Sequence, residues 1–145
     1  MRAVAVSKFG GVPTVMDVPK PTPRADEMLI RLTAAGVNPF DHTIAQGLVR
    51  GRAPHTFPLV LGVDGAGVVE QTGADVSRLQ VGQRVYGMFL QPPYGKGTYA
   101  EYIAVPERAW VSRAPQGVPL AHTAAAPSAG VTALALIEVT RPVST

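Results

Sequence analysis

Residues 57–87, FPLVLGVDGAGVVEQTGADVSRLQVGQRVYG, decide the fold. The apolar residues 59–61 lead into a glycine-rich corner, and the β-branched pair at 68–69 predicts a strand entered through a tight bend. A polar turn begins at Gly73, and residues 84–86 then predict a second strand. We therefore expect two neighbouring strands joined by a turn.

Three glycines of this stretch, Gly62, Gly65 and Gly67, lie very close together. Glycine weakens an ordinary strand because it has no side chain to pack and loses much conformational freedom on folding. Its presence here predicts a positive φ angle or the close approach of another backbone.

The composition favours one small domain that is rich in turns. The chain has 145 residues, 46% of them hydrophobic, which is enough for one real core and hardly for two. Gly 15 and Pro 14 together make one residue in five, which favours short strands over a helical bundle.

Charge and cysteine content exclude several classes of function. The net charge of +3 is spread without a basic stripe, so no nucleic-acid partner is indicated. With Cys 0 there is no disulfide, no thiolate nucleophile and no cysteine-bound metal. There is no apolar run of about 18 residues and no signal-peptide core, so we expect a cytoplasmic protein without a membrane partner.

The rest of the chain predicts further strands and three helical segments. Alternation or β-branched residues predict strands at residues 1–8, 15–18, 27–33, 98–105 and 109–111. A helical turn is expected at 120–126, and Ser128 is expected to cap a last helix that runs to Val139. Asn38 is a good N-cap, Pro39 suits the first helical position and Asp41 the first turn, so we expect a short helix at 40–46.

The central stretch resembles a known pattern, LGxDxAGVVxxxGxxVxxxxxGDRV, with Gln83 where Asp is usual. The segments GVNPFDHTIAQG and GTYAEYIAV resemble two further motifs of the same family, the medium-chain dehydrogenase/reductase superfamily, in its zinc-independent quinone oxidoreductase branch. The resemblance implies a mainly β, GroES-like, partly open barrel with short helices, without the family's Rossmann domain. It places a GroES-like catalytic and substrate domain at residues 1–125. Residues 126–145 would begin a linker helix toward an absent dinucleotide-binding domain.

The resemblance also implies that no metal is bound. Zinc-dependent members carry Cys at the position of Asn38 and a His-Glu pair at Val63 and Asp64. Catalytic zinc needs about three protein ligands, and one carboxylate cannot hold it. His42 and the other two histidines show no paired spacing, so we expect a metal-free protein.

By resemblance, the parent protein would reduce quinones or α,β-unsaturated carbonyls by hydride transfer from NADPH or NADH, and would be a homodimer. Hydride delivered to such an acceptor sends charge to a distal oxygen, which hydrogen-bond donors can stabilise. The resemblance makes Asn38 and Asp41 the catalytic candidates, and Asn38 and Thr132 the cofactor contacts. We expect the 145 residues alone to be inactive, because the cofactor would be held mainly elsewhere.

Each candidate also has a structural interpretation. Asn38 would cap the helix in either case, and a first-turn carboxylate such as Asp41 favours any helix. Asp64 fits a hydrogen-bonding turn residue better than a catalytic one, and Thr132 equally fits a helix residue bonded to its own backbone.

Two alternative functions stay open. One is an enoyl-reductase module of a larger synthase, and the other is a free-standing, non-catalytic GroES-like binding domain. If the chain was cut from a two-domain parent, Leu134, Leu136 and Ile137 should form an exposed apolar patch.

Overall fold

The computed structural model describes residues 1–140, so the expected linker segment, residues 126–145, is described only as far as Thr140. The elements in chain order are β1 (Arg2–Val6), β2 (Thr14–Asp17), β3 (Glu27–Ala35), α1 (Pro39–Ala45), β4 (Leu59–Val60), β5 (Asp64–Thr72), β6 (Arg84–Met88), β7 (Tyr102–Pro106), β8 (Trp110–Arg113), α2 (Leu120–Thr123) and α3 (Pro127–Thr140).

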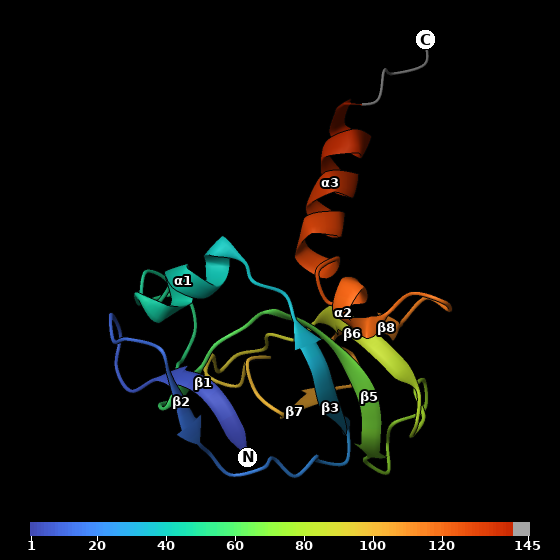
Figure 1. Cartoon of the computed structure of the whole chain (residues 1–145), viewed down its shortest axis with the longest axis horizontal. Helices are drawn as coiled ribbons and strands as arrows, with labels where there is room; N and C mark the ends of the chain where they lie inside the picture. Colours follow the sequence, from blue (N-terminus) through green and yellow to red (C-terminus); the bar gives the residue numbers. More distant parts are fainter. Residues whose placement is uncertain (141–145) are drawn as a thin grey trace.

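The strands form two antiparallel sheets that curl into a partly open barrel (Figure 1). One sheet has the order β7-β3-β5-β6-β8, and the other has the order β2-β1-β4. This mainly β architecture confirms the fold class expected from the sequence. The two shorter helices lie on the barrel, whereas α3 projects away from it (Figure 1).

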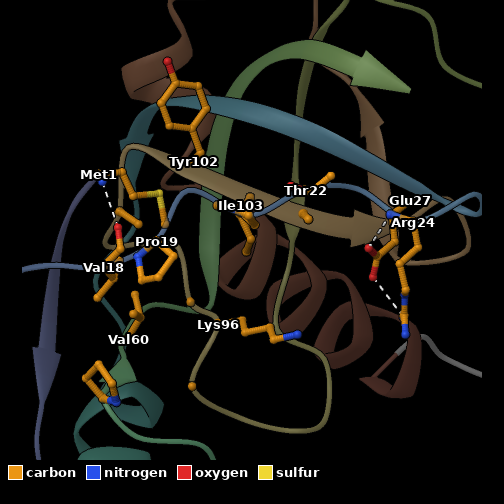
Figure 2. Close-up of a pocket in the computed structure, with 16 residues that line it drawn as sticks. Met1, Val18, Pro19, Thr22, Arg24, Glu27, Val60, Lys96, Tyr102 and Ile103 are labelled. Carbon is orange, nitrogen blue, oxygen red and sulfur yellow. Dashed lines mark hydrogen bonds and ion pairs between the residues drawn. The ribbon is translucent and has the colours of Figure 1, made fainter. Parts of the chain in front are cut away.

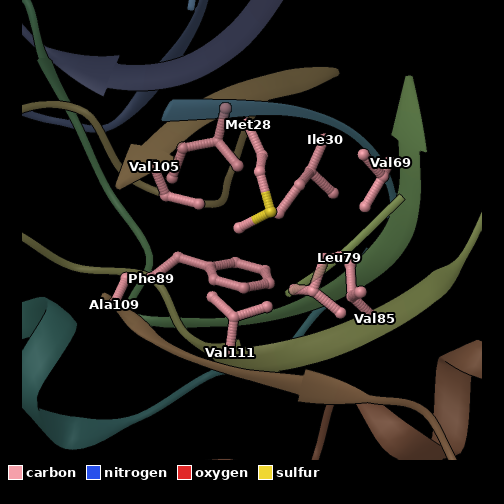
Figure 3. Close-up of a cluster of buried hydrophobic side chains, with 10 residues drawn as sticks. Met28, Ile30, Val69, Leu79, Val85, Phe89, Val105, Ala109 and Val111 are labelled. Atoms are coloured by element: carbon pink, nitrogen blue, oxygen red, sulfur yellow. The ribbon is translucent and has the colours of Figure 1, made fainter. Parts of the chain in front are cut away.

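The main core lies inside the five-stranded sheet (Figure 3). β3 and β5 supply its centre because their inward residues are long or β-branched, and Phe89 packs beneath them. The buried members are Met28, Ile30, Val69, Leu79, Val85, Phe89, Ile103, Val105, Ala109 and Val111. A second cluster, which includes Val6, Ile44 and Leu59, packs α1 against the barrel.

Both expected features, a positive φ angle and the close approach of another backbone, occur in the glycine corner, at different glycines. Gly62 has a φ of 98°, and a β-carbon there would lie 2.5 Å from Cδ1 of Tyr99. At Gly67 a β-carbon would collide with the backbone carbonyl of Arg31 in the neighbouring strand. The strand β5 begins at Asp64, so Gly67 lies inside the strand and not in a bend ahead of it. Glycine is needed at this position because the backbone of β3 passes close to it.

Two expected elements differ in detail. The strand expected at 98–105 is regular only from Tyr102, because the N–H groups of Thr98 and Tyr99 donate to the carbonyls of Gly62 and Leu61 at the glycine corner. The last helix begins at Pro127, so Ser128 lies inside it and is not its N-cap.

Candidate functional site

The turn before α1 is closed by backbone and carboxylate hydrogen bonds. Asn38 is extended, at φ −127° and ψ 149°, as an N-cap residue should be. Its N–H donates to Oδ2 of Asp41 at 2.7 Å, and the N–H of Asp41 donates to the Asn38 carbonyl at 3.0 Å. The amide Nδ2 of Asn38 is shielded from solvent and has no hydrogen-bond partner among residues 1–140. This turn therefore holds an unused hydrogen-bond donor.

Asp41 is fixed from a second direction by Tyr99. The carboxylate is only 4% exposed, and the Tyr99 hydroxyl donates to the same Oδ2 at 2.8 Å. Burial, the hydrogen bond to Asp41 and the charge of Asp41 raise the pKa of Tyr99 well above its usual value. Tyr99 therefore stays a neutral donor at ordinary pH. The sequence pattern missed this role, since nothing local connects residues 58 positions apart.

Asp64 is 1% exposed and is fully engaged in hydrogen bonds. Its Oδ2 accepts the N–H of Ser128, and its Oδ1 accepts the Ser128 hydroxyl, both at 2.8 Å. Its backbone carbonyl accepts the hydroxyl of Thr98 at 2.8 Å and the N–H of Gly36 at 3.0 Å. The expected hydrogen-bonding residue is present, but its partners lie in a distant helix and a distant loop.

Asn38 and Thr132 line one groove of about 570 Å³ between the α1 turn and α3. We call this the Asn38–Thr132 groove. Its lining residues are Asn38, Pro39, Phe40, Ser128, Ala129, Thr132, Ala133 and Leu136. The Thr132 hydroxyl donates to the Ser128 carbonyl at 2.8 Å. Asp41 is not among the lining residues, so it reaches the groove only through its hydrogen bond to Asn38.

A neighbouring cavity of about 370 Å³ shares Phe40 with the groove. Its walls are largely apolar, and Gln91, Tyr94 and Arg108 add polar groups, of which Arg108 is charged. Such an apolar wall with few polar groups is typical of small-molecule sites.

Another cavity, of about 460 Å³, lies between the connector after β2 and β7 (Figure 2). Val18, Pro19, Lys96, Tyr102 and Ile103 are among its lining residues. None of the candidate residues from the sequence lines it, so we do not assign it to the site.

The described residues contain no cluster of three or more His, Cys, Asp or Glu side chains that could hold a metal ion. At the position that the sequence resemblance linked to zinc, both Asp64 oxygens already accept hydrogen bonds.

Residues 24–116 match the family model of the alcohol dehydrogenase GroES-like domain. The chain belongs to this family. It is 38% identical to a chloroplastic quinone-oxidoreductase homologue of Spinacia oleracea, over 92% of this chain and 40% of that protein. It is 34% identical to the NADPH-dependent alkenal/one oxidoreductase of Arabidopsis thaliana, over 92% of this chain and 36% of that protein.

Solved structures of quinone oxidoreductases share the fold of this GroES-like domain. That of Pseudomonas syringae pv. Tomato superposes with a TM-score of 0.84 at 32% identity, over 99% of this chain and 42% of that chain. A mycobacterial protein solved in complex with NADPH gives a TM-score of 0.79 at 31% identity, over 99% and 43%. The chain thus spans about two fifths of the length of the relatives that it matches. Within residues 1–140, no helix is long and apolar enough to cross a bilayer.

Proposed function

We propose that this chain is the catalytic and substrate-binding part, residues 1–125, of an NAD(P)H-dependent oxidoreductase, with residues 126–145 leading toward a nucleotide-binding part. The parent enzyme reduces quinones or α,β-unsaturated carbonyls without zinc. The names of its relatives, among them quinone and alkenal/one oxidoreductases, support this class of substrate.

The observation that carries the proposal is the Asn38–Thr132 groove, in which both cofactor candidates meet. The amide side chain of Asn38 and the hydroxyl of Thr132 belong to residues that line the groove, and both are polar groups suited to a carboxamide such as that of nicotinamide. A bound nicotinamide supplies the hydride. Asn38 and Thr132 would orient it, and the apolar cavity beside Phe40 would hold the acceptor and exclude water.

Asp41 serves this site by fixing the turn that carries Asn38. Its Oδ2 accepts the Asn38 N–H and the Tyr99 hydroxyl together, so a small shift of the carboxylate would move Asn38. Asp41 would thus act by holding Asn38 in position, which agrees with the place of Asp41 behind the groove.

The test is a titration of the ¹⁵N-labelled chain with NADPH, together with an assay of NADPH oxidation by a simple quinone. We expect weak binding that shifts the resonances of Asn38 and Thr132, and no turnover by the chain alone. Asn38→Ser keeps a capping side chain but removes the amide, and Thr132→Val removes only the hydroxyl; both should weaken the shifts.

Shifts confined to another surface would refute the site, for example those of the basic loop at residues 50–52. Turnover by the 145 residues alone, unchanged in Asn38→Ser, would refute the proposed division between a catalytic part and a nucleotide-binding part.

A further inference from the structure

Helix α3 begins without a cap of its own. The residue before it, Ala126, has no side-chain acceptor, so the first N–H groups of the helix need partners elsewhere. Asp64 supplies one from 64 residues away by accepting both the N–H and the hydroxyl of Ser128. A carboxylate at this end of a helix also complements the positive end of the helix dipole.

We propose that Asp64 is a positioning residue that docks α3 onto the barrel and thereby sets the geometry of the Asn38–Thr132 groove. The link to cofactor binding rests on the function proposed above. The docking itself rests on the contacts of Asp64 alone.

Asp64 is suited to this role because its own position is rigid. It begins β5, and its carbonyl is held by the Thr98 hydroxyl and the Gly36 N–H. A β-carbon at Gly36 would lie 2.6 Å from the carbonyl oxygen of Ala124 and 3.1 Å from Cβ of Asp64, so the residue just after α2 packs directly against this corner. The carboxylate therefore projects from a fixed point of the barrel.

The rest of α3 has little else to hold it. Pro127 is its only buried residue within the described part of the chain, and the helix rises away from the barrel (Figure 1). Ser128 and Thr132 are one turn apart on the same face. The orientation of α3 fixed at Ser128 therefore decides whether Thr132 faces Asn38.

Backbone amide hydrogen exchange tests the docking on the chain itself. Asp64→Asn keeps the shape of the side chain but removes its charge and one of its two acceptors. Hydrogen bonds to charged groups are strong, so exchange at residues 128–132 should accelerate on the order of tenfold or more. Ser128→Ala removes only the hydroxyl, and the acceleration should be smaller, roughly severalfold.

The double variant Asp64→Asn/Ser128→Ala should exchange little faster than Asp64→Asn alone, because the two side chains act as one unit. Amides of the β3–β5 ladder should keep the wild-type rates in all variants. Asp75→Asn, at an exposed aspartate in a turn, is the matched control and should change neither region.

The NADPH-induced resonance shifts at Thr132 and Asn38 distinguish a role of Asp64 in positioning α3 from a general structural role. In Asp64→Asn, the NADPH-induced shift at Thr132 should be lost while that at Asn38 persists. Unchanged exchange at 128–132, or equal acceleration of the β3–β5 amides, would overturn the proposal, as would equal loss of both NADPH-induced shifts. If wild-type chain shows no NADPH shift, the proposed function fails, and the docking is still decided by exchange alone. If Asp64→Asn does not fold, Ser128→Ala decides.

Discussion

Replacing Gly62 by alanine should destabilise the chain more than any change at a glycine that is free of neighbours. Gly62 has a φ of 98°, which side-chain-bearing residues rarely adopt, and its β-carbon would lie 2.5 Å from Cδ1 and 2.8 Å from N of Tyr99. The β-carbon would also collide with Oγ1 of Thr98. Gly82 has a similar φ of 86° and no atom within 4 Å of such a β-carbon, so Gly82→Ala is the matched control.

The two variants separate backbone strain from packing. The left-handed backbone costs an L-residue about 1–2 kcal/mol, and this cost is common to both variants. Forced overpacking adds about 1–3 kcal/mol, and only Gly62→Ala meets it. We therefore expect free energies of unfolding lowered by about 2–5 kcal/mol for Gly62→Ala and by about 1–2 kcal/mol for Gly82→Ala.

Urea denaturation measures this difference. With an m-value of about 2 kcal/mol/M, the midpoint of Gly62→Ala should lie about 0.5–1.5 M below that of Gly82→Ala. Displacement of Tyr99 should also weaken its bond to Asp41, which would shift the amide resonance of Asn38 in Gly62→Ala alone. Equal midpoints for the two variants, with the Asn38 resonance unmoved, would refute the argument that the corner is a packed contact.

Three further outcomes are expected. Because the pKa of Tyr99 in the folded chain lies above 10.0, the contribution of Tyr99 to stability is present below pH 10 and is lost as the pH rises through the raised pKa. The phenolate absorbance that Tyr99→Phe removes should appear only above pH 10, and Asp41→Asn should move its appearance to lower pH. A titration that Asp41→Asn leaves unmoved would contradict the link between the two residues. The backbone N–H of Arg78 helps hold the pKa of Glu107 below 4.5, so the stability that the ionised Glu107 contributes is present above that pH and is lost as the pH falls through the lowered pKa. Glu107→Gln should therefore lower the urea midpoint at neutral pH but not in strong acid. An equal effect at both pH values would count against this. Leu136 is 62% exposed, so the chain should bind a hydrophobic dye and Leu136→Ser should bind less of it; equal fluorescence would show that α3 does not offer this surface.

Local patterns predicted most of the strands and helices because local rules govern those elements, whereas their arrangement as a barrel was implied by the resemblance to a known family. The alternation at residues 1–8 becomes β1, the strand expected at 27–33 becomes β3, and the signals at Asn38, Pro39 and Asp41 become α1. The apolar residues Leu134, Leu136 and Ile137 of α3 are exposed, as expected if they lack a partner. For the strands and α1, the deciding interaction lies within a few residues or follows from periodicity.

The contacts that organise the candidate site were not predictable in the same way. The sequence predicted Ser128 as an N-cap because it follows Pro127 near the start of an apolar helical segment. In the structure its hydroxyl donates instead to Asp64, which lies 64 positions earlier in the chain. Tyr99 reads as a strand residue, yet its hydroxyl reaches Asp41. Both outcomes depend on tertiary geometry at the glycine corner, where Gly62 makes room for Tyr99.

Two of the buried carboxylates, Asp41 and Asp64, are engaged in structural hydrogen bonds near the Asn38–Thr132 groove and do not line it. Asp41 binds the turn of α1 and Asp64 binds α3, so the groove itself is lined by neutral residues, with no acid, base or ammonium group among them. A hydride acceptor in the neighbouring cavity beside Phe40 would meet Arg108 besides the neutral Gln91 and Tyr94, and an acceptor suited to these donors would spread its developing charge over its own conjugated system to a distal oxygen. Quinones and α,β-unsaturated carbonyls can do so, whereas a simple ketone would concentrate the charge on one oxygen. The donors in this lining are compatible with the proposed class of acceptor, quinones and α,β-unsaturated carbonyls.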